Sequence, residues 1–522
     1  MLSTIRQSKF IHRSIRSSIT LPILSNLSSR NSLRFNSGSV QDNFHRPDVA
    51  GSDDAADAAD AAATILADSR DSQKQPNKVT WIDALREREK QLKEGKVLDS
   101  YSYVTPKTTE ISEKTRADSF SYLILPFKED QWLCDAYINA YGRLRAGQLF
   151  QDLDALAGRI AYRHCSPAEP VNVTASVDRI YMVKKVDEIS NYNFVLAGAC
   201  TWTGRSSMEI TVRGYAFEDS VPENITEDTL PKSNIFLTAN FTFVARNPIT
   251  HKSFAINRLL PVKEQEWLDY RRAESHNAKK KLAGKKATLI QPTDEENRLI
   301  YDMWLSSKSF ENREHPKGIE FMKDTKISST IFMQPQYRNR HSYMIFGGYL
   351  LRQSFELAYC CAAGFSGAGP RFVSLDSTTF KAPVPVGSVC SMDASISYTE
   401  HIHEGPEDID ADSPFNFRLP ATNTLSKNPE AFLSEPGTLI QVKVDTRIRN
   451  VDTGEGKESG TFIYSFFVPK ESYGNGNNKN GYTSVIPQTY SEMMTYIGGR
   501  RRAQDTAYYV GTLPKPTTTT TD

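Results

Sequence analysis

Two segments combine glycine and a carboxylate in a way that suits chemistry on a carbonyl group. In GQLFQDLDALAG, Gly147 precedes Asp154 by seven residues, and in FGGYLLRQSFE, Gly347 and Gly348 precede Glu356. Apolar residues recur at helical spacing after each glycine, so each glycine stands at the expected start of a helix. Such a start offers unpaired N–H groups and a partial positive charge, and glycine lets a carbonyl come close to the backbone.

The two acids differ in their position relative to these glycines. Seven residues make about two helical turns, so Asp154 stands on the same face as Gly147, whereas Glu356 is one residue further from Gly348 and is rotated by about 100°. The neighbours of Asp154 are apolar: Leu149, Phe150, Leu153, Leu156 and Ala157. Burying a charged side chain among apolar residues costs free energy, so we expect Asp154 to have a functional role. The alternatives are a solvated helix acid and glycines that serve only tight packing or a turn.

Asp152 lies on another face of the same helix, and we predict a surface position for it.

The composition is that of an ordinary folded protein. The 522 residues are 39% hydrophobic and 24% charged, which is enough for two or three domains. The net charge of +1 argues against a dedicated nucleic-acid or polybasic membrane binder. No apolar run is long enough for a transmembrane helix, and the six cysteines form no C-x-x-C pair, which fits a reducing compartment.

The ends of the chain differ from its middle. Residues 1–41 contain no Asp or Glu but many Arg and Ser residues, which predicts a mitochondrial presequence over 1–36; a disordered basic tail is the alternative. We expect a disordered linker at 37–78 and a charged helical extension at 79–118. The threonine-rich residues 506–522 are expected to be an unstructured tail.

Between these ends, the same order of parts occurs twice. Residues 119–262 and 319–505 each contain one long apolar helix followed by about four runs rich in Val, Ile, Thr, Tyr and Phe. The helix would cover the apolar face of an antiparallel sheet, which is an α+β arrangement. A helical linker at 263–318 would join the two blocks, and the acidic, proline-rich stretch 403–437 reads as an inserted loop.

Several motifs in this order resemble one protein family. The motifs are IFGGYLL, RAGQLFQDLDALAG, VARN…INRLLP, FKAPVPVGS and PQTYSEMMTYI, and together they span roughly residues 120–500. The chain resembles the mitochondrial double-hotdog acyl-CoA thioesterases, of the acyl-coenzyme A thioesterase 9 type. The resemblance implies two tandem hotdog domains, each a long central helix wrapped by a curved antiparallel sheet, which form a pseudo-dimer. It also implies hydrolysis of fatty acyl-CoA to free acid and coenzyme A at the seam between the domains.

The resemblance further implies which residues form the site. In this family the helix acid of one hotdog works with a polar loop residue of the other, which assigns Asp154 together with Asn339 or His341. Gly347 and Gly348 would leave room for the thioester carbonyl over the first helical turn.

A second seam site would combine Glu356 with Asn139 and Gly147. Arg143, Arg145 and Ala146 depart from the small residues that are usual in this loop, so we expect this site to be degenerate.

The phosphates of CoA require cations. Lys279 and Lys280, in a basic cluster of the linker, and Arg246 and Arg258, beside the last strand of the first block, are the candidates; a solvated helical face is the alternative for the lysines.

Other chemistries find little support in the sequence. GFSGAG (364–369) is close to a nucleophile elbow but follows a helix, and the histidines of His401–His403 are predicted to lie at the surface. We therefore expect no metal and no cofactor.

Two other functions remain open: a hotdog-fold hydratase or dehydratase acting on enoyl- or hydroxyacyl-CoA, and a non-catalytic component of a mitochondrial assembly. The expected partners are the acyl-CoA substrate and further copies of the chain, possible as a trimer of double hotdogs, in the mitochondrial matrix.

Overall fold

The computed structural model describes residues 110–285, 290–310, 318–339, 344–376, 378–402, 433, 435–473 and 482–512. All of them belong to one compact unit, Gln75–Asp522. The predicted presequence (1–36), the predicted disordered linker (37–78) and most of the predicted extension (79–118) lie outside the described residues, as does most of the predicted loop 403–437.

The first repeat contains one central helix, α5, five main strands and the further long helix α6. In chain order its elements are β1 (Glu113–Thr115), α3 (Arg116–Ser119), β2 (Ser121–Leu125), α4 (Gln131–Tyr137), α5 (Ala146–Cys165), β3 (Val171–Met182), β4 (Asn193–Thr203), β5 (Ser207–Phe217), β6 (Ile235–Arg246), β7 (Arg258–Leu260) and α6 (Glu264–Lys285).

The second repeat has the same order of parts around helix α8. After α7 (Asp294–Phe310) come β8 (Ile319–Phe321), β9 (Ile327–Phe332), α8 (Gly347–Ser366), β10 (Arg371–Leu375), β11 (Thr378–Thr379), β12 (Val389–Ile402), β13 (Gly437–Arg449), β14 (Gly456–Pro469), β15 (Ser484–Ile486) and α9 (Tyr490–Thr512).

The main strands of both repeats form one continuous antiparallel sheet. Its order is β2-β4-β5-β6-β3 in the first half and, counted from the far edge, β9-β12-β13-β14-β10 in the second. The halves join where β3 pairs with β10, in the register Ser374 to Tyr181 and Leu375 to Ile180. Each half thus places its five strands in the order 1-3-4-5-2, with the long helix after the first strand, which is the hotdog arrangement. The prediction of two tandem hotdog domains is confirmed.

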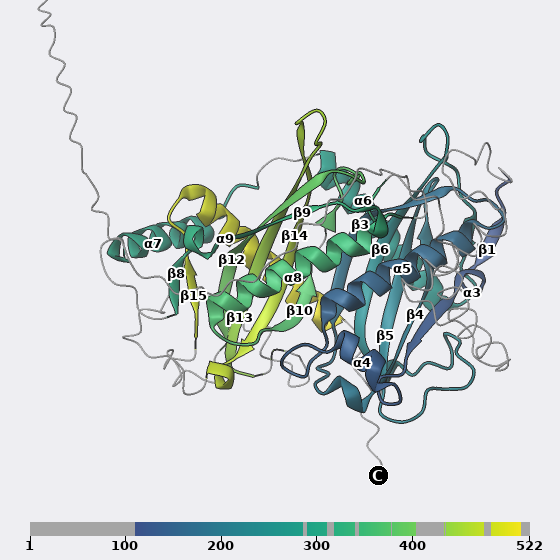
Figure 1. Cartoon of the computed structure of the whole chain (residues 1–522), viewed down its shortest axis with the longest axis horizontal. Coiled ribbons are helices and arrows are strands. Elements are labelled where there is room, and N and C mark those ends of the chain that lie inside the picture. The colour runs from purple at the N-terminus through teal and green to yellow at the C-terminus, as the bar shows by residue number, and fades with distance from the viewer. Residues whose placement is uncertain are drawn as a thin grey trace, which may run out of the picture. The chain divides into compact units, whose positions relative to one another are not determined.

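Helices α5 and α8 lie across the same side of this sheet and contact each other (Figure 1). Phe150 and Leu153 of α5 are fully buried, and each such side chain contributes about 1.5–3 kcal/mol through the loss of water contact. Helix α8 ends at Gly367, whose φ of +65° is the left-handed conformation that glycine adopts at helix ends. The two central helices therefore share one apolar core with the sheet.

Each repeat also ends in a helix that packs on its own sheet. Strand β4 is buried along its whole length because it contacts both α5 and α6, and α9 packs on the equivalent strand, β12. Both helices carry Arg-Arg-Ala, and the alanines, Ala273 and Ala503, are buried. Segment 263–318 was predicted to be only a linker; α6 instead belongs to the first repeat, because its apolar and charged residues hold it on β4.

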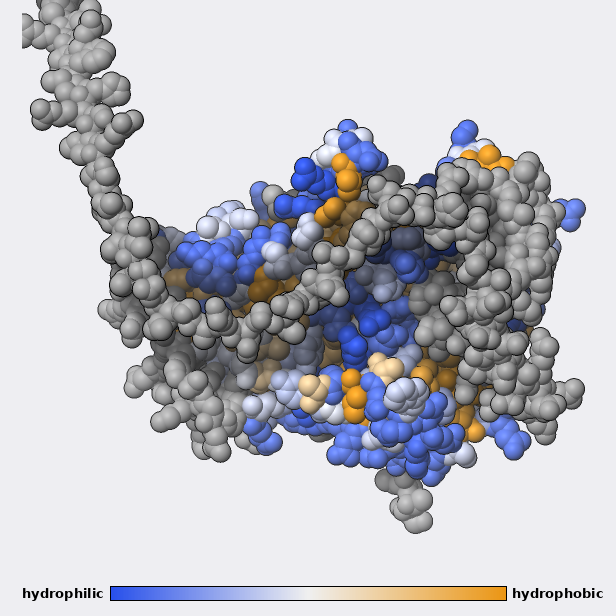
Figure 2. Space-filling model, viewed as in Figure 1, coloured by the Kyte–Doolittle hydropathy of each residue, from blue (hydrophilic) through white to orange (hydrophobic). Residues whose placement is uncertain are grey.

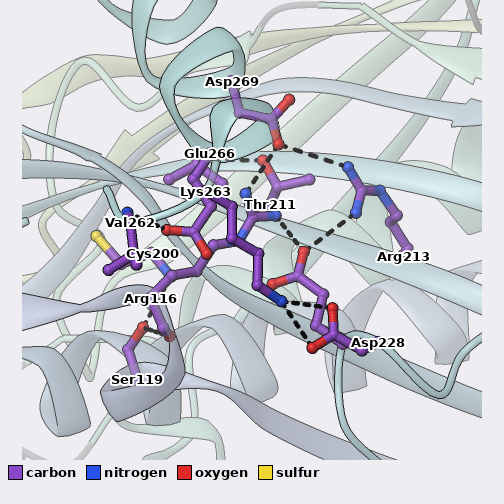
Figure 3. Close-up of polar contacts among 12 residues, drawn as sticks. Arg116, Ser119, Cys200, Thr211, Arg213, Asp228, Val262, Lys263, Glu266 and Asp269 are labelled. Atoms are coloured by element: carbon purple, nitrogen blue, oxygen red, sulfur yellow. Dashed lines mark hydrogen bonds and ion pairs between the residues drawn. The ribbon is translucent and has the colours of Figure 1, made fainter. Parts of the chain in front are cut away.

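An ion-pair cluster fixes α6 in this position. Arg116 on α3 is buried and binds Asp269 of α6 at 2.8 Å and Glu227 at 2.6 Å, and Arg213 of β5 also approaches Asp269, at 3.9 Å (Figure 3). Lys263 binds Asp228 at 2.6 Å near the start of the helix. These contacts join α3, β5 and α6 into one body.

Two predicted boundaries differ from the structure. Residues 113–115 were placed in an extension, but they pair with β7 just as β8 pairs with β15, so they belong to the first repeat. Helix α9 continues to Thr512, beyond the predicted start of the tail at 506. The first proline after Pro487 is Pro514, so no residue before it forces the helix to end.

The face of the molecule in Figure 2 is mainly polar. In Figure 2 the described atoms on this face are largely hydrophilic, with hydrophobic residues in small areas. Among the described residues, none of the helices has the length and apolar character needed to cross a bilayer.

Candidate active site

Helix α5 carries Asp154 to the first turn of α8. Gly147 lies against Phe355 and Glu356, whereas Asp154 lies against Gly347, so the two helices run in opposite directions. The start of each helix therefore faces the second and third turns of the other. This arrangement creates two related seams, of which the one at Asp154 is called the first seam and the one at Gly147 the second seam.

The carboxylate of Asp154 is fully buried and has two hydrogen-bond donors. The backbone N–H of Gly348 donates to Oδ2 at 2.7 Å, and the hydroxyl of Thr174 on β3 donates to Oδ1 at 3.0 Å. Burial raises the pKa of Asp154 to about 7, because the charged form loses its water, and the two donors oppose this shift by stabilising the carboxylate. The group can thus gain or lose a proton near neutral pH.

The two glycines are needed because other groups lie very close to them. A Cβ on Gly347 would lie 3.1 Å from Oδ2 of Asp154 and 3.3 Å from Oγ1 of Thr174. A Cβ on Gly348 would lie 2.6 Å from the ring of Phe346 and 3.0 Å from Cα of Gln151. The ring of Phe346, helix α5 and the acid therefore all lie close to the helix start, so the glycines serve tight packing at the same place as they face the acid.

The predicted polar partner lies in the loop before α8. Asn339 is half-buried, and its N–H donates to the carbonyl of Met344 at 2.8 Å. Before α5, the backbone N–H of Asn139 donates to the carbonyl of Arg143 at 2.8 Å, which closes a loop one residue shorter. The two asparagines thus occupy similar positions before the central helices. Asn339 stays a prediction as a partner of Asp154, and His341 lies outside the described residues.

The second seam lacks a carboxylate in the place of Asp154. Phe355 occupies the equivalent helical position and packs edge-on against Phe150, with ring centres 5.2 Å apart. Glu356 does reach Gly147, at 3.1 Å from the place of its Cβ, but its carboxylate is bound by Arg145 at 2.8 Å. The structure thus brings Glu356 to Gly147, as the predicted second site requires, but pairs its carboxylate with Arg145 there.

A cavity remains beside this second seam. Asn139, Arg143, Phe355, Tyr359 and Arg371 are among its lining residues, and the open space is about 40 Å³. Glu356 is not among the residues that line it. The structure thus brings Asn139 and the start of α5 to one cavity, but without the predicted acid.

The predicted phosphate-binding residues do not converge. Arg246 and Arg258 are exposed at the ends of β6 and β7, and Arg246 donates to the carbonyl of His251 at 3.2 Å. The ammonium of Lys280 binds Asp178 and donates to Ser176 at 2.7 Å. A buried carboxylate therefore already pairs with Lys280, and its role in holding a phosphate stays a prediction. The side chain of Lys279 lies outside the described residues.

Two other predictions need correction. Asp152 was expected at the surface, but it is buried and accepts a hydrogen bond from the Tyr137 hydroxyl, because α4 covers that face of α5. His401 was also expected at the surface, but its ring contacts the Ser484 hydroxyl at 2.9 Å and stacks on Tyr482. Strand β15 covers it there.

Sequence reasoning missed Thr174. Nothing in its sequence neighbourhood marks it, because it is one of several threonines in a β-rich segment. Its importance follows from β3 lying next to β10 at the junction of the two halves, which carries its hydroxyl to Asp154.

One group of side chains has the residue types of a metal site. The ligand atoms of Asp178, Glu209 and His276 lie within 4.8 Å of one another, under helix α6. Lys280 already binds Asp178, and Asn277 donates to Glu209 at 3.2 Å. This cluster therefore already contains an internal cation and a hydrogen-bond donor, and it is separate from the first seam.

The first seam combines the groups that hydrolysis of a carbonyl compound requires. A buried acid with a pKa near neutrality can accept a proton from water. The start of α8 supplies backbone N–H groups and a partial positive charge for a developing oxyanion. The acid comes from the first repeat and the helix start from the second, so the two groups meet only because the repeats pack together.

Comparison with known proteins identifies the family. The chain is 30% identical over 404 residues to acyl-coenzyme A thioesterase 2, chloroplastic, of Humulus lupulus. The alignment covers 74% of this chain and 80% of that protein. The chain is 26% identical over 429 residues to acyl-coenzyme A thioesterase 9, mitochondrial, of Mus musculus, covering 80% and 84%. A solved structure of an acyl-CoA hydrolase from Staphylococcus aureus is 20% identical to this chain, with a TM-score of 0.27. The match covers 34% of this chain and 92% of the hydrolase chain. No family model matches the chain.

The fold defines the class as a double-hotdog protein. The sequence identity over most of both chains is more specific: this protein belongs to the acyl-coenzyme A thioesterase family and is an enzyme.

Proposed function

We propose that the enzyme hydrolyses fatty acyl-CoA thioesters to free fatty acid and coenzyme A at the first seam. The observation that carries this proposal is the buried carboxylate of Asp154, which one repeat presents to the Gly348 N–H of the other at 2.7 Å. The names of the relatives supply the substrate class, since those proteins are acyl-coenzyme A thioesterases.

In the proposed reaction, Asp154 acts as the general base. Its carboxylate accepts a proton from a water, and the water oxygen attacks the thioester carbonyl carbon. The carbonyl oxygen becomes an oxyanion, which the N–H groups at the start of α8 stabilise. Protonation of Asp154 weakens the hydrogen bond that its carboxylate accepts from the Gly348 N–H. This N–H can then donate to the oxyanion as negative charge develops on the carbonyl oxygen.

The intermediate then loses coenzyme A. The C–S bond breaks, the carbonyl re-forms, and the sulfur takes the proton that Asp154 received, which gives a free acid and a thiol. Thr174 keeps the carboxylate oriented through its hydroxyl at 3.0 Å. Asn339 is proposed to position the attacking water, because a neutral amide can both donate and accept.

We also propose that the enzyme works in mitochondria and forms a homo-oligomer. The acid-free, arginine-rich start of the chain and relatives named as mitochondrial support the first point. Fusion of residues 1–36 to a fluorescent protein tests it: mitochondrial fluorescence is expected, and diffuse fluorescence contradicts it. Light scattering measures the oligomer, for which a trimer of double hotdogs is the expectation.

The direct test is release of free thiol from a series of acyl-CoAs of increasing chain length. Wild type and Glu356→Gln are expected to release thiol at similar rates, because Glu356 is already neutralised by Arg145. Asp154→Asn keeps the shape of the side chain but cannot accept the proton, so its rate should fall by about 10²–10⁴-fold. The proposal would be refuted if no acyl-CoA of any chain length released thiol, or if the enzyme hydrated an enoyl-CoA instead.

A further inference from the structure

The cavity of the second seam is lined by a pair of arginines. The lack of a carboxylate in the place of Asp154 does not explain why they are there. The cavity lies where α5 begins, and Met182, Phe355 and Phe372 form its apolar side. Asn139, Arg143, Asp187, Tyr359 and Arg371 form a polar side, on which the two arginines outnumber the one acid. If this cavity were only a former active site that Phe355 now fills, it would not need a pair of arginines.

The two arginines are only partly neutralised by their neighbours. Arg143 and Arg371 share Asp187, at 3.6 and 3.4 Å, and Arg371 approaches Glu435 at 3.3 Å. These distances exceed the roughly 2.7–2.9 Å of strong charge-assisted hydrogen bonds. Both acids are more than a third exposed, whereas the side chain of Arg371 is only 12% exposed. The guanidinium groups therefore retain attraction for a further anion.

Two buried donors of this cavity have no acceptor among the described residues. They are the hydroxyl of Tyr359 and Nε of Arg371. Buried donors are rarely left unpaired in folded proteins, and both residues line the same space. One acceptor group with two oxygens, placed between them, satisfies both.

The second seam also lacks a means to hydrolyse a bound compound. Phe355 stands where the first seam has Asp154, and it belongs to an aromatic cluster with Phe150, Phe372 and Tyr464. Two acids lie near this cavity: Glu356 is bound to Arg145 at 2.8 Å, and Asp187, which lines the cavity, is shared by Arg143 and Arg371. A compound in this cavity is consequently held without being activated.

We propose that the second seam is a non-hydrolytic binding site for the carboxylate of a short organic acid. The carboxylate oxygens accept from Arg371, Arg143 and Tyr359, and the few carbons behind it contact Phe355, Phe372 and Met182. The apolar side chains beside the arginines are few, so a ligand with a short chain is enough to cover them. A short acid is of the chemical class that thioester hydrolysis releases, but the inference does not depend on activity at the first seam.

Calorimetric titration of the full chain with butyrate tests the proposal. Wild type is expected to bind butyrate saturably with one site per chain. Tyr359→Phe removes one hydrogen bond to a charged group, so the affinity should fall about tenfold. The variant should unfold at the same or a higher temperature than wild type, because an unpaired buried hydroxyl is removed.

Three further titrations test another residue of the cavity, a residue of the other seam and a competing anion. Arg143→Met should weaken butyrate binding as well, and Asp154→Asn, at the other seam, should leave it unchanged. Inorganic phosphate is expected not to displace butyrate. The proposal is overturned if butyrate does not bind, if Tyr359→Phe binds it as tightly as wild type, if Asp154→Asn loses binding, or if phosphate competes equally. Thiol release is measured separately, so failure of the proposed function would be seen independently.

Discussion

Asp154 and Gly348 are joined by a hydrogen bond of 2.7 Å between residues 194 positions apart in the chain. The bond links the central helix of one hotdog to the first turn of the other, so the acid and the helix start cannot be separated without opening the pseudo-dimer. Because the acid is fully buried, its proton affinity is set by this contact and by Thr174 rather than by water. The predictions below follow from that environment.

The first prediction concerns the pH dependence of hydrolysis. Asp154 must be ionised to accept a proton, and its pKa is raised to about 7 by burial. The value of kcat/KM should therefore increase with pH, reach half its maximum near pH 7 and fall about tenfold per unit well below it. Glu356→Gln should show the same profile. A midpoint near 4, typical of an exposed carboxylate, would contradict this role for Asp154.

The second prediction separates the hydroxyl of Thr174 from its bulk. Its bond to Oδ1 of Asp154 favours the ionised form, so Thr174→Val should raise the pKa further and move the midpoint of the rate profile up by about one unit. Thr174→Ser keeps the hydroxyl and should retain the wild-type midpoint. An equal midpoint in all three proteins would show that Thr174 has only a packing role.

The third prediction concerns the close approach at Gly347. A methyl group there would meet Asp154 and Thr174 at 3.1–3.3 Å, so Gly347→Ala should displace the acid and lower kcat/KM by about 10²-fold, the scale expected for a misplaced catalytic group. Gly364, in the same helix, has open space around the equivalent position. Gly364→Ala should leave activity intact and stabilise the protein by about 0.5–1 kcal/mol in thermal unfolding. Equal activity of both variants would argue against the site.

The fourth prediction concerns stability as a function of pH. The folded protein holds the Asp154 proton more tightly than the unfolded chain does, since the pKa rises from 3.8 to about 7. The stability due to this proton is complete below pH 3.8 and is lost as the pH rises to about 7, amounting to on the order of 4 kcal/mol. Asp154→Asn should therefore gain stability relative to wild type between pH 4 and 8 in chemical unfolding. A constant difference would disprove the shift.

The fifth prediction decides the role of Lys280. Its partner Asp178 is buried, with a side chain only 2% exposed, so Lys280→Met should leave an unpaired buried charge and destabilise the protein by about 3 kcal/mol. The KM for acyl-CoA, measured on folded protein, should not change. A raised KM with unchanged thermal stability would support Lys280 as a phosphate ligand.

The sequence was sufficient for the repeated architecture. The order of one apolar helix and about four β-rich runs occurs twice within the chain, and helical and strand periodicities are local properties that the sequence displays directly. Asp154 could also be selected, because an acid among Leu149, Phe150 and Leu153 must lie on a buried face. By contrast, α6 appeared to be a linker, since charged residues dominate its sequence and only the ion pairs of Arg116 and Asp269 show what they bind.

The details of the site depended on contacts between distant parts of the chain. Local periodicity placed Asp154 on the face of Gly147, but packing of α5 against α8 brings it to Gly347 and Gly348. The same packing makes Thr174 a partner, neutralises Glu356 with Arg145 and leaves a cavity beside Phe355. The sequence alone determined the two apolar central helices and the β-rich runs, because the spacing of hydrophobic residues is a local property of the chain. Only the tertiary structure decided which groups they meet, because that depends on how two helices from separate repeats cross.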